Sequence, residues 1–171
     1  GDNETTAQSR GKTPLTITSA IRLVLDKAAT VDEAVALLEN HDMHSVIDTA
    51  HHFIIADATG KSVVVEWTGN KMYVSETKVL TNHYVAESPK KGVFTHENSK
   101  VRYDMLEKCG NENNWIMDAE KMKDCMKSVS VGSFDFEGQS ITAWSAVYEP
   151  ENKRISYYFR ENYEKPIIIE F

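Results

Sequence analysis

The chain has 171 residues, of which 41% are hydrophobic and 26% charged, and its formal net charge is -7. This composition is ordinary for one globular domain with a sizeable core, since a chain of this length buries roughly 70% of the surface that its unfolded form exposes. The acidic balance and the scattered Lys and Arg argue against a nucleic-acid-binding surface. No apolar run approaches the roughly 20 residues of a membrane-spanning helix, so we expect no contact with a membrane.

The N-terminal part divides into a polar leader and two helices. Residues 1–14 contain two Gly, one Pro and no apolar cluster, which predicts a mobile leader or a truncated loop. From Ile17 to Ala28 apolar residues recur every three or four positions, which places them on one face of a helix. Thr30 and Glu33 form a capping-box pattern that begins a second, short helix. The two helices are expected to pack on a sheet.

Four short strand-like runs follow between residues 51 and 85. They are Phe53 to Ala56, Val63 to Trp67, Met72 to Val74 and Lys78 to Thr81. Short polar segments separate the runs, which predicts three successive hairpin links and therefore an antiparallel meander. The polar stretch from Glu87 to Glu97 contains Pro89 and Gly92, and we expect it to form a loop that lies over a pocket as a lid.

Helical spacing returns in the second half of the chain and is followed by more strand-like runs. The helical positions are Val101, Met105 and Leu106 and then, after an Asp118 cap, Met122, Cys125 and Met126. The strand-like runs are Ile141 to Tyr148, Arg154 to Arg160 and Ile167 to Phe171. The order of helices, strands, helices and strands predicts an α+β fold in which helices are layered on antiparallel sheets. Residues 15–171 are expected to form this domain.

The chain contains two cysteines, and four histidines between residues 41 and 52 suggest a metal site. Cys109 and Cys125 lack CxxC spacing, so a reducing, cytoplasmic compartment is the simpler interpretation of their presence. His41 and His44 are expected at a helix end, where a protonated imidazole complements the helix dipole. The adjacent His51-His52 pair on a strand points to opposite faces of the sheet. We therefore expect no metal and no cofactor.

Asn82 follows the last run of the predicted meander. Taken by itself, an Asn at this place is first of all a turn residue. Its functional interpretation is a side-chain NH2 donor in a cleft, the group type that stabilises a developing oxyanion. Asp57 and Glu66 fit hairpin chemistry better than a catalytic carboxylate pair. Ser145 lacks the nearby His and Asp arrangement of a nucleophilic triad.

Several short motifs occur in a specific order along the chain. They are the paired helices, the Asp57 to Glu66 hairpin, VLTNHYV at residues 79–85, Ser99-x-x-Arg102-Tyr103 and the strand around Trp144-Ser145. In this order they resemble the choloylglycine hydrolase and penicillin V acylase family, whose members are N-terminal nucleophile hydrolases of linear amides. The resemblance runs from Thr13 to Phe171 and implies part of a four-layer αββα sandwich.

The resemblance implies roles for two residues of this chain. Asn82 would donate to the tetrahedral oxyanion, although its default interpretation is a turn. Arg102, by default a solvated helix residue, would lie beside the catalytic thiol and favour the thiolate. Lys100 and Arg22 are the alternatives to Arg102 in a different register. Family enzymes use an N-terminal Cys as nucleophile, whereas this chain begins with Gly1 and Asp2.

We therefore expect the C-terminal part of a cysteine amide hydrolase acting on a bile salt, penicillin V or another small N-acyl amide. The chain alone is expected to be inactive, because its missing N-terminal part supplies the nucleophile. Exposed apolar faces are expected to favour a homo-oligomer. Two alternatives stay open: a separate, non-catalytic binding or assembly domain, and a processed subunit that regains activity when joined by its other half.

Overall fold

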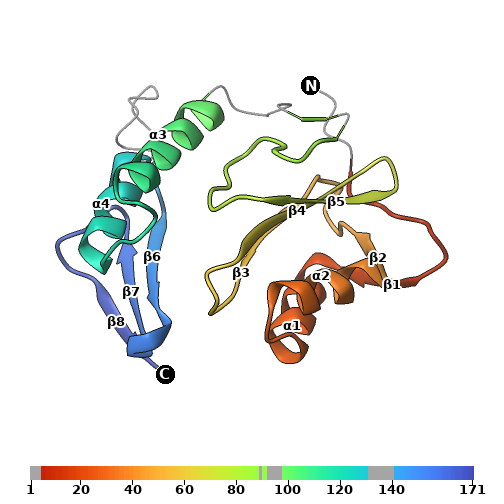
Figure 1. The fold of residues 1–171 in the computed structure, drawn as a ribbon, viewed down its shortest axis with the longest axis horizontal. Coiled ribbons are helices and arrows are strands. Elements are labelled where there is room, and N and C mark those ends of the chain that lie inside the picture. Colours follow the sequence, from red (N-terminus) through yellow and green to blue (C-terminus); the bar gives the residue numbers. More distant parts are fainter. Residues whose placement is uncertain (1–4, 89, 92–97, 131–140) are drawn as a thin grey trace. The chain divides into compact units, whose positions relative to one another are not determined.

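The computed structural model divides the chain into two compact units, Gly1–Lys100 and Val101–Phe171 (Figure 1). It describes residues 5–88, 90–91, 98–130 and 141–171. Each unit contains helices and a three-stranded antiparallel sheet, which confirms the predicted α+β class. None of the helices within the described ranges has the length and apolar character needed to cross a membrane. The lid expected between Glu87 and Glu97 falls largely outside the described residues.

Two helices of the first unit follow the sequence prediction closely. Helix α1 spans Ile17–Lys27 and helix α2 spans Val31–Glu39. The hydroxyl of Thr30 accepts the Glu33 backbone N–H at 3.3 Å, and the Glu33 carboxylate accepts the Thr30 N–H at 3.3 Å. The predicted capping box is therefore confirmed. Because it satisfies donors at both positions, it fixes where α2 begins.

The segment from Thr5 to Thr16 packs against the rest of the first unit, where the sequence predicted a mobile leader or a truncated loop up to residue 14. Strand β1 (Thr13–Thr16) pairs in parallel with strand β2 (His41–His44). Thr6 and Gln8 are both buried. The Arg10 guanidinium contacts the Asp42 carboxylate at 2.9 Å, and the Arg10 backbone N–H donates to it at 2.7 Å. Burial raises the pKa of Asp42, but these hydrogen bonds outweigh it and hold that pKa below its ordinary value.

The central sheet of the first unit is an antiparallel meander. Strands β3 (His52–Ala56), β4 (Ser62–Thr68) and β5 (Lys71–Glu76) lie in this order. Gly60 takes the positive φ of 86° that the first turn needs. The core buries Ala20, Val31, Leu38, Met43, Val63, Val65 and Trp67. The predicted fourth run, Lys78 to Thr81, is not a strand but irregular backbone.

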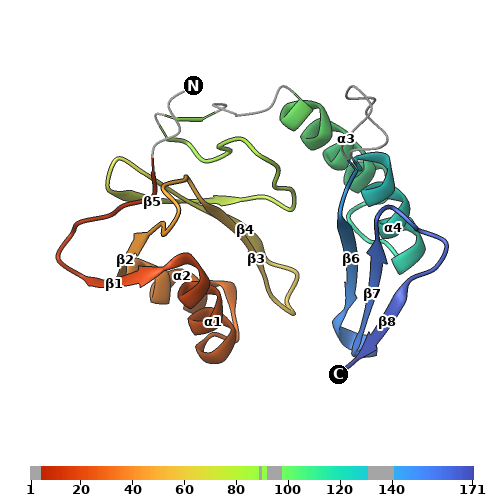
Figure 2. The same ribbon diagram turned by 180° about the vertical axis from the view of Figure 1, so that it is seen from behind.

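The second unit packs one helix against a second sheet (Figure 2). Helix α3 (Asn98–Glu112) begins in the last residues of the first unit, and α4 (Ala119–Ser128) is capped by Asp118, which accepts the Lys121 N–H at 2.9 Å. Strands β6 (Trp144–Glu149), β7 (Arg154–Phe159) and β8 (Ile167–Glu170) form the antiparallel sheet. Its core joins Val147, Tyr158 and Tyr163 to Met126 and Ala119 of α4.

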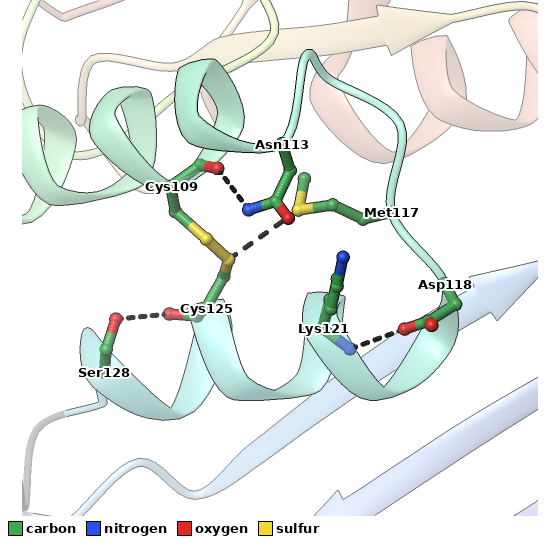
Figure 3. The surroundings of a disulfide bond; sticks show 7 residues. All are labelled: Cys109, Asn113, Met117, Asp118, Lys121, Cys125 and Ser128. Atoms are coloured by element: carbon green, nitrogen blue, oxygen red, sulfur yellow. Dashed lines mark hydrogen bonds between the residues drawn. A yellow bond between two sulfur atoms is a disulfide. The ribbon is translucent and has the colours of Figure 1, made fainter.

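A disulfide bond between Cys109 and Cys125 links α3 to α4 (Figure 3). The two Cα atoms are 6.2 Å apart, within the usual range for such a bond. Asn113 donates to the Cys109 carbonyl at 2.9 Å, and Ser128 donates to the Cys125 carbonyl at 2.7 Å. The sequence favoured a reducing compartment for these cysteines. Disulfide bonds are typical of oxidising compartments, so this bond argues against the predicted cytoplasmic location, which stays a prediction.

Candidate functional site

The segment from Val79 to Ala86 follows strand β5 and carries the candidate oxyanion donor. Most of its side chains are buried, among them Thr81, His83 and Tyr84. Asn82 is exposed. An exposed amide on a backbone that is otherwise anchored in the protein is the arrangement expected of a polar group presented to a ligand. The anchors are two buried polar side chains, Ser99 and Glu66.

Ser99 anchors the segment at Asn82 itself. This serine lies in the first turn of α3 and is fully buried. Its Oγ accepts the Asn82 backbone N–H at 2.7 Å. The same Oγ lies 3.0 Å from the Thr81 hydroxyl and 2.9 Å from Nδ1 of His83. Thr81 in turn donates to the Ser99 carbonyl at 3.0 Å.

Glu66 anchors the segment three residues further on. It lies in β4 and is fully buried. Its carboxylate accepts the Val85 N–H at 3.0 Å and the Ala86 N–H at 2.7 Å. Opposite it on β3, His52 places Nδ1 3.3 Å from the same carboxylate. A buried carboxylate that accepts backbone N–H groups fixes their positions, so Glu66 holds the backbone at Val85 and Ala86 in place.

Asp57 is a turn and capping residue. Its Oδ1 accepts the Thr59 N–H at 2.9 Å, and its Oδ2 accepts the Val31 N–H at the start of α2, also at 2.9 Å. The hydrogen bonds from the Thr59 hydroxyl and the Val31 backbone hold the pKa of Asp57 below its ordinary value. The carboxylate is therefore engaged in structure at the far end of the hairpin from Glu66.

Arg102 belongs to the second unit and lies on α3, one turn after Ser99. Its side chain is half-buried, and burial lowers the pKa of its guanidinium, which nevertheless stays protonated near neutral pH. The alternatives differ from it. Lys100 is exposed, and Arg22 forms an exposed ion pair with Asp26 at 2.7 Å on α1. Arg102 therefore remains the better candidate for a desolvated site.

Three of the four histidines considered as metal ligands, His41, His51 and His52, have hydrogen-bonding partners for their rings. His41 lies directly after the C-cap of α2, with Nδ1 2.7 Å from the Leu37 carbonyl, which agrees with the predicted helix end. His44 lies at the far end of strand β2, so the prediction is wrong for that residue. Nε2 of His51 lies 3.1 Å from the Ser45 hydroxyl. Within the described part of the chain, no three His, Cys, Asp or Glu side chains are grouped to hold a metal ion.

The strand residues Trp144 and Ser145 point to opposite faces of the second sheet. Ser145 is buried, and its Oγ lies 3.1 Å from the Tyr163 hydroxyl. Trp144 is largely exposed and stacks on Tyr157 with 5.8 Å between the ring centroids. Ser145 is thus part of the covered face of the second sheet and Trp144 part of the open face.

An apolar groove of about 460 Å³ lies between α1 and the edge strand β3 of the first unit. Ile21, Val24 and Leu25 line one side, while Phe53, Ile55 and Leu80 contribute to the other. Leu25 keeps 75% of its surface exposed. Leu80 is two residues from Asn82, so the groove reaches the segment that carries the candidate donor.

Comparison with protein-family models places these features in a family. Residues 4–164 match the model for acyl-coenzyme A:6-aminopenicillanic acid acyl-transferase. The chain belongs to this acyl-transferase family. No relative was found among curated protein sequences. The family match covers the motifs on which the resemblance to choloylglycine hydrolases and penicillin acylases rested, and it confirms that recognition.

Solved structures agree with the family assignment at the level of fold. The acyl-transferase family chain is similar to a mutant of the conjugated bile acid hydrolase from Clostridium perfringens, with a TM-score of 0.70 and 18% sequence identity over 98% of this chain. A second variant of that enzyme gives a TM-score of 0.68 and 15% identity over 99% of this chain. The chain spans 65% of the length of the first neighbour and 67% of the second. The predicted N-terminal nucleophile hydrolase fold is therefore confirmed.

Sequence reasoning missed what holds the candidate donor in place. Ser99 was noted only as the first residue of a Ser-x-x-Arg pattern, and its bond to the Asn82 backbone was not foreseen. Glu66 was assigned to the hairpin without its contacts to Val85 and Ala86. A polar residue at an inward position of a strand is a signal for such a role, because a buried carboxylate requires donors nearby.

Proposed function

We propose that this chain is the oxyanion-binding part of a cysteine N-terminal nucleophile hydrolase that cleaves linear amide C–N bonds. The observation that carries the proposal is the exposed Asn82 on a segment anchored by the buried Ser99 and Glu66. A preorganised amide donor stabilises the charge that develops on an attacked carbonyl without reorganising during the reaction. The family match and the shared fold with a bile acid hydrolase support the same reaction class.

The other catalytic groups are proposed to come from this chain and from an N-terminal segment that begins with the nucleophilic Cys, called the Cys-led segment below. In the proposed mechanism the N-terminal Cys thiol attacks the amide carbonyl while its own α-amino group, with a pKa near 8 in model compounds, accepts the proton. The amine leaves, and water then releases the acyl group from the thioester. Arg102 is proposed to favour the thiolate through its positive charge. Cys109 and Cys125 cannot replace the nucleophile, because both are within the chain and joined in a disulfide.

The substrate proposed is a small N-acyl amide, with conjugated bile salts and penicillin V as the test compounds. The chain alone should give no turnover. The same chain preceded by its own Cys-led segment should hydrolyse at least one of these amides and should lose activity after alkylation of that Cys. If the chain alone hydrolyses an amide, and a double variant with Cys109→Ser and Cys125→Ser does so too, the proposal that the nucleophile lies in the Cys-led segment is contradicted. A lack of turnover in both forms would favour a non-catalytic binding or assembly domain.

Acyl transfer to an amine is a second candidate function, favoured by the description of the matching family. Both reactions pass through the same thioester and differ in whether water or an amine accepts the acyl group. Adding a β-lactam amine to the assay separates them. Transfer predicts a new N-acyl product and a matching decrease in free acid, whereas hydrolysis predicts free acid alone.

We further propose that the rest of the domain covers the apolar groove beside β3. The groove leaves large side chains such as Ile21, Leu25 and Ile54 in contact with water, and about a third of the length of the two structural neighbours lies outside the match to this chain. Exposed apolar surface of this kind favours self-association when it is uncovered. Sedimentation should therefore detect oligomers of this chain and fewer of the longer form. Equal behaviour of both forms would contradict the proposal.

A further inference from the structure

The hydroxyl of Ser99 has three polar partners within the described residues. One hydroxyl supplies one proton and two acceptor lone pairs. In this structure Oγ of Ser99 accepts the Asn82 backbone N–H at 2.7 Å and lies within hydrogen-bond distance of both Thr81 and His83. The residues on either side of Asn82 therefore contact the same buried oxygen as Asn82 itself.

Counting protons assigns the direction of each bond in this cluster. Thr81 donates its hydroxyl proton to the Ser99 carbonyl at 3.0 Å, and Ser99 donates its own to the Thr81 oxygen at 3.0 Å. Both hydroxyl protons are then used. The contacts of His83 Nδ1 to Ser99 Oγ at 2.9 Å and to Thr81 Oγ1 at 3.1 Å therefore require a proton on Nδ1. With that proton, Ser99 Oγ uses its full capacity of one donated and two accepted bonds.

We infer that Ser99 is a positioning residue for Asn82, which it holds by accepting the Asn82 N–H while its contacts to Thr81 and to the Nδ1–H of His83 fix Oγ in place. The cluster lies within residues 81–99 of the first unit and is buried, so water does not compete for these bonds. Its functional consequence rests on the proposed role of Asn82. A displacement of about 1 Å at a catalytic group can cost roughly 100-fold in rate.

Amide hydrogen exchange on the chain itself tests the positioning role directly. Replacing Ser99 by Ala removes the acceptor, and the Asn82 amide should exchange about 2- to 10-fold faster. The matched control is Ser130→Ala in the second unit. It also removes a buried serine hydroxyl, which in this case donates to the Lys127 carbonyl. The control should leave Asn82 unchanged. An Asn82 amide that exchanges equally in Ser99→Ala and in the parent chain would overturn the inference.

Thr81→Val provides a second variant if Ser99→Ala does not fold. It removes one contact that orients Oγ but keeps the bond to the Asn82 N–H, so it should raise exchange at Asn82 by less than Ser99→Ala does. Circular dichroism confirms that each variant is folded. An Asn82 amide that exchanges equally in a folded Thr81→Val variant and in the parent chain would contradict the positioning role of Ser99.

Kinetics of the active, Cys-led form separate this inference from the proposed function. Ser99→Ala should lower kcat about 10- to 100-fold with KM within twofold, and Ser99→Thr, which keeps the hydroxyl, should recover most of that loss. If Asn82→Ala reduces turnover while Ser99→Ala does not, the positioning role is refuted and the proposed function stands. If Asn82→Ala itself has no effect, the oxyanion role fails, and faster exchange at Asn82 in Ser99→Ala still supports the hydrogen-bond assignment.

Nitrogen NMR tests the proton assignment of His83 in the same chain. Long-range 15N–1H correlations should show a protonated Nδ1 in the parent chain. A bare Nδ1 would overturn the assigned bond directions, since the ring would then accept from a hydroxyl whose proton is already used. The experiment needs no substrate and no nucleophile.

Discussion

The two three-stranded antiparallel sheets of this chain share a topology but differ in how their faces are covered. In the first sheet Val63, Val65 and Trp67 are buried beside the helices, and the opposite face also contains fully buried residues, Val64 and Glu66. In the second sheet only one face is buried, at Val147 and Tyr158 beside α4. Both faces of the first sheet thus contain buried residues, whereas one face of the second sheet stays largely exposed.

The open face of the second sheet is apolar along its whole length. The strand register places on one face Trp144, Ala146, Tyr148, Ile155, Tyr157, Phe159, Ile167 and Ile169. Trp144, Tyr148 and Phe159 each expose more than half of their surface. A sheet that is apolar on both faces is typical of one covered on both sides. The second unit combines a small core beside α4 with a disulfide, whereas the first combines a larger core with buried polar anchors.

The largest expected effect comes from removing the polar anchor of the first sheet. Glu66→Ala leaves the N–H groups of Val85 and Ala86 buried without their acceptor, so the free energy of unfolding should fall by about 3–5 kcal/mol. Glu66→Gln keeps one oxygen acceptor and should lose less. Urea denaturation measures both changes. Glu76→Ala, at an exposed position of β5, is the control, and a loss there as large as at Glu66 would contradict the account.

Removing the disulfide should destabilise the second unit selectively. The bond closes a loop across 16 residues, which in the chain-entropy model stabilises the folded state by about 3 kcal/mol. Cys109→Ser and Cys125→Ser should each produce this loss, and the double variant should add little to it. Hydrogen exchange resolved by unit should show the change after residue 100. Equal acceleration in β3, β4 and β5 would contradict the division between the two units.

Substitutions on the open and covered faces of the second sheet should differ in their effect on stability. Tyr148→Lys on the open face should change the free energy of unfolding by less than about 1 kcal/mol and should reduce binding of a hydrophobic dye. Val147→Ala on the covered face should cost about 1–3 kcal/mol by leaving a cavity. Thermal unfolding with dye binding measures both. Similar losses at the two positions would show that the open face is covered in solution.

The smallest expected effect is a pH dependence at His51 of the first unit. Burial, and then the neighbouring His52, lower the pKa of His51 below its unfolded value of about 6.5. The unfolded chain therefore binds more protons than the folded chain just below that pH, and stability should fall as the pH drops from about 6.5 through the lower folded pKa. His51→Gln should flatten this part of the stability profile. An unchanged slope in the variant would contradict the assignment.

How far the sequence predicts the structure depends on the range of the interactions. The helices α1 and α2 and the β3–β4 hairpin follow from local signals, namely apolar spacing, the Thr30 cap and the turn at Gly60. Strands β1 and β2 were missed because their paired residues, such as Thr13 and His41, lie 28 positions apart, which local periodicity does not register. The sequence from Lys78 to Thr81 resembles a strand. In the structure the backbone that follows it is held by side chains, since Ser99 accepts the Asn82 N–H and Glu66 accepts the Ala86 N–H.

The candidate site shows the same limit. Asn82 and Arg102 could be named because short motifs surround them, but the bond from Asn82 to Ser99 spans 17 residues and depends on how α3 meets the Val79–Ala86 segment. The pairing of Cys109 with Cys125 was missed for a similar reason. Each cysteine lies in a separate helix, and only the packing of α3 and α4 brings their Cα atoms to 6.2 Å.

The measurement that tests the central claim most directly is steady-state hydrolysis of an N-acyl amide by the Cys-led form carrying Asn82→Ala. If Asn82 donates to the oxyanion, kcat should fall about 100- to 1000-fold with little change in KM. Asn152→Ala, which alters an exposed asparagine of the second unit, is the matched control and should keep full activity. An Asn82→Ala enzyme with kcat within threefold of the parent would contradict the account.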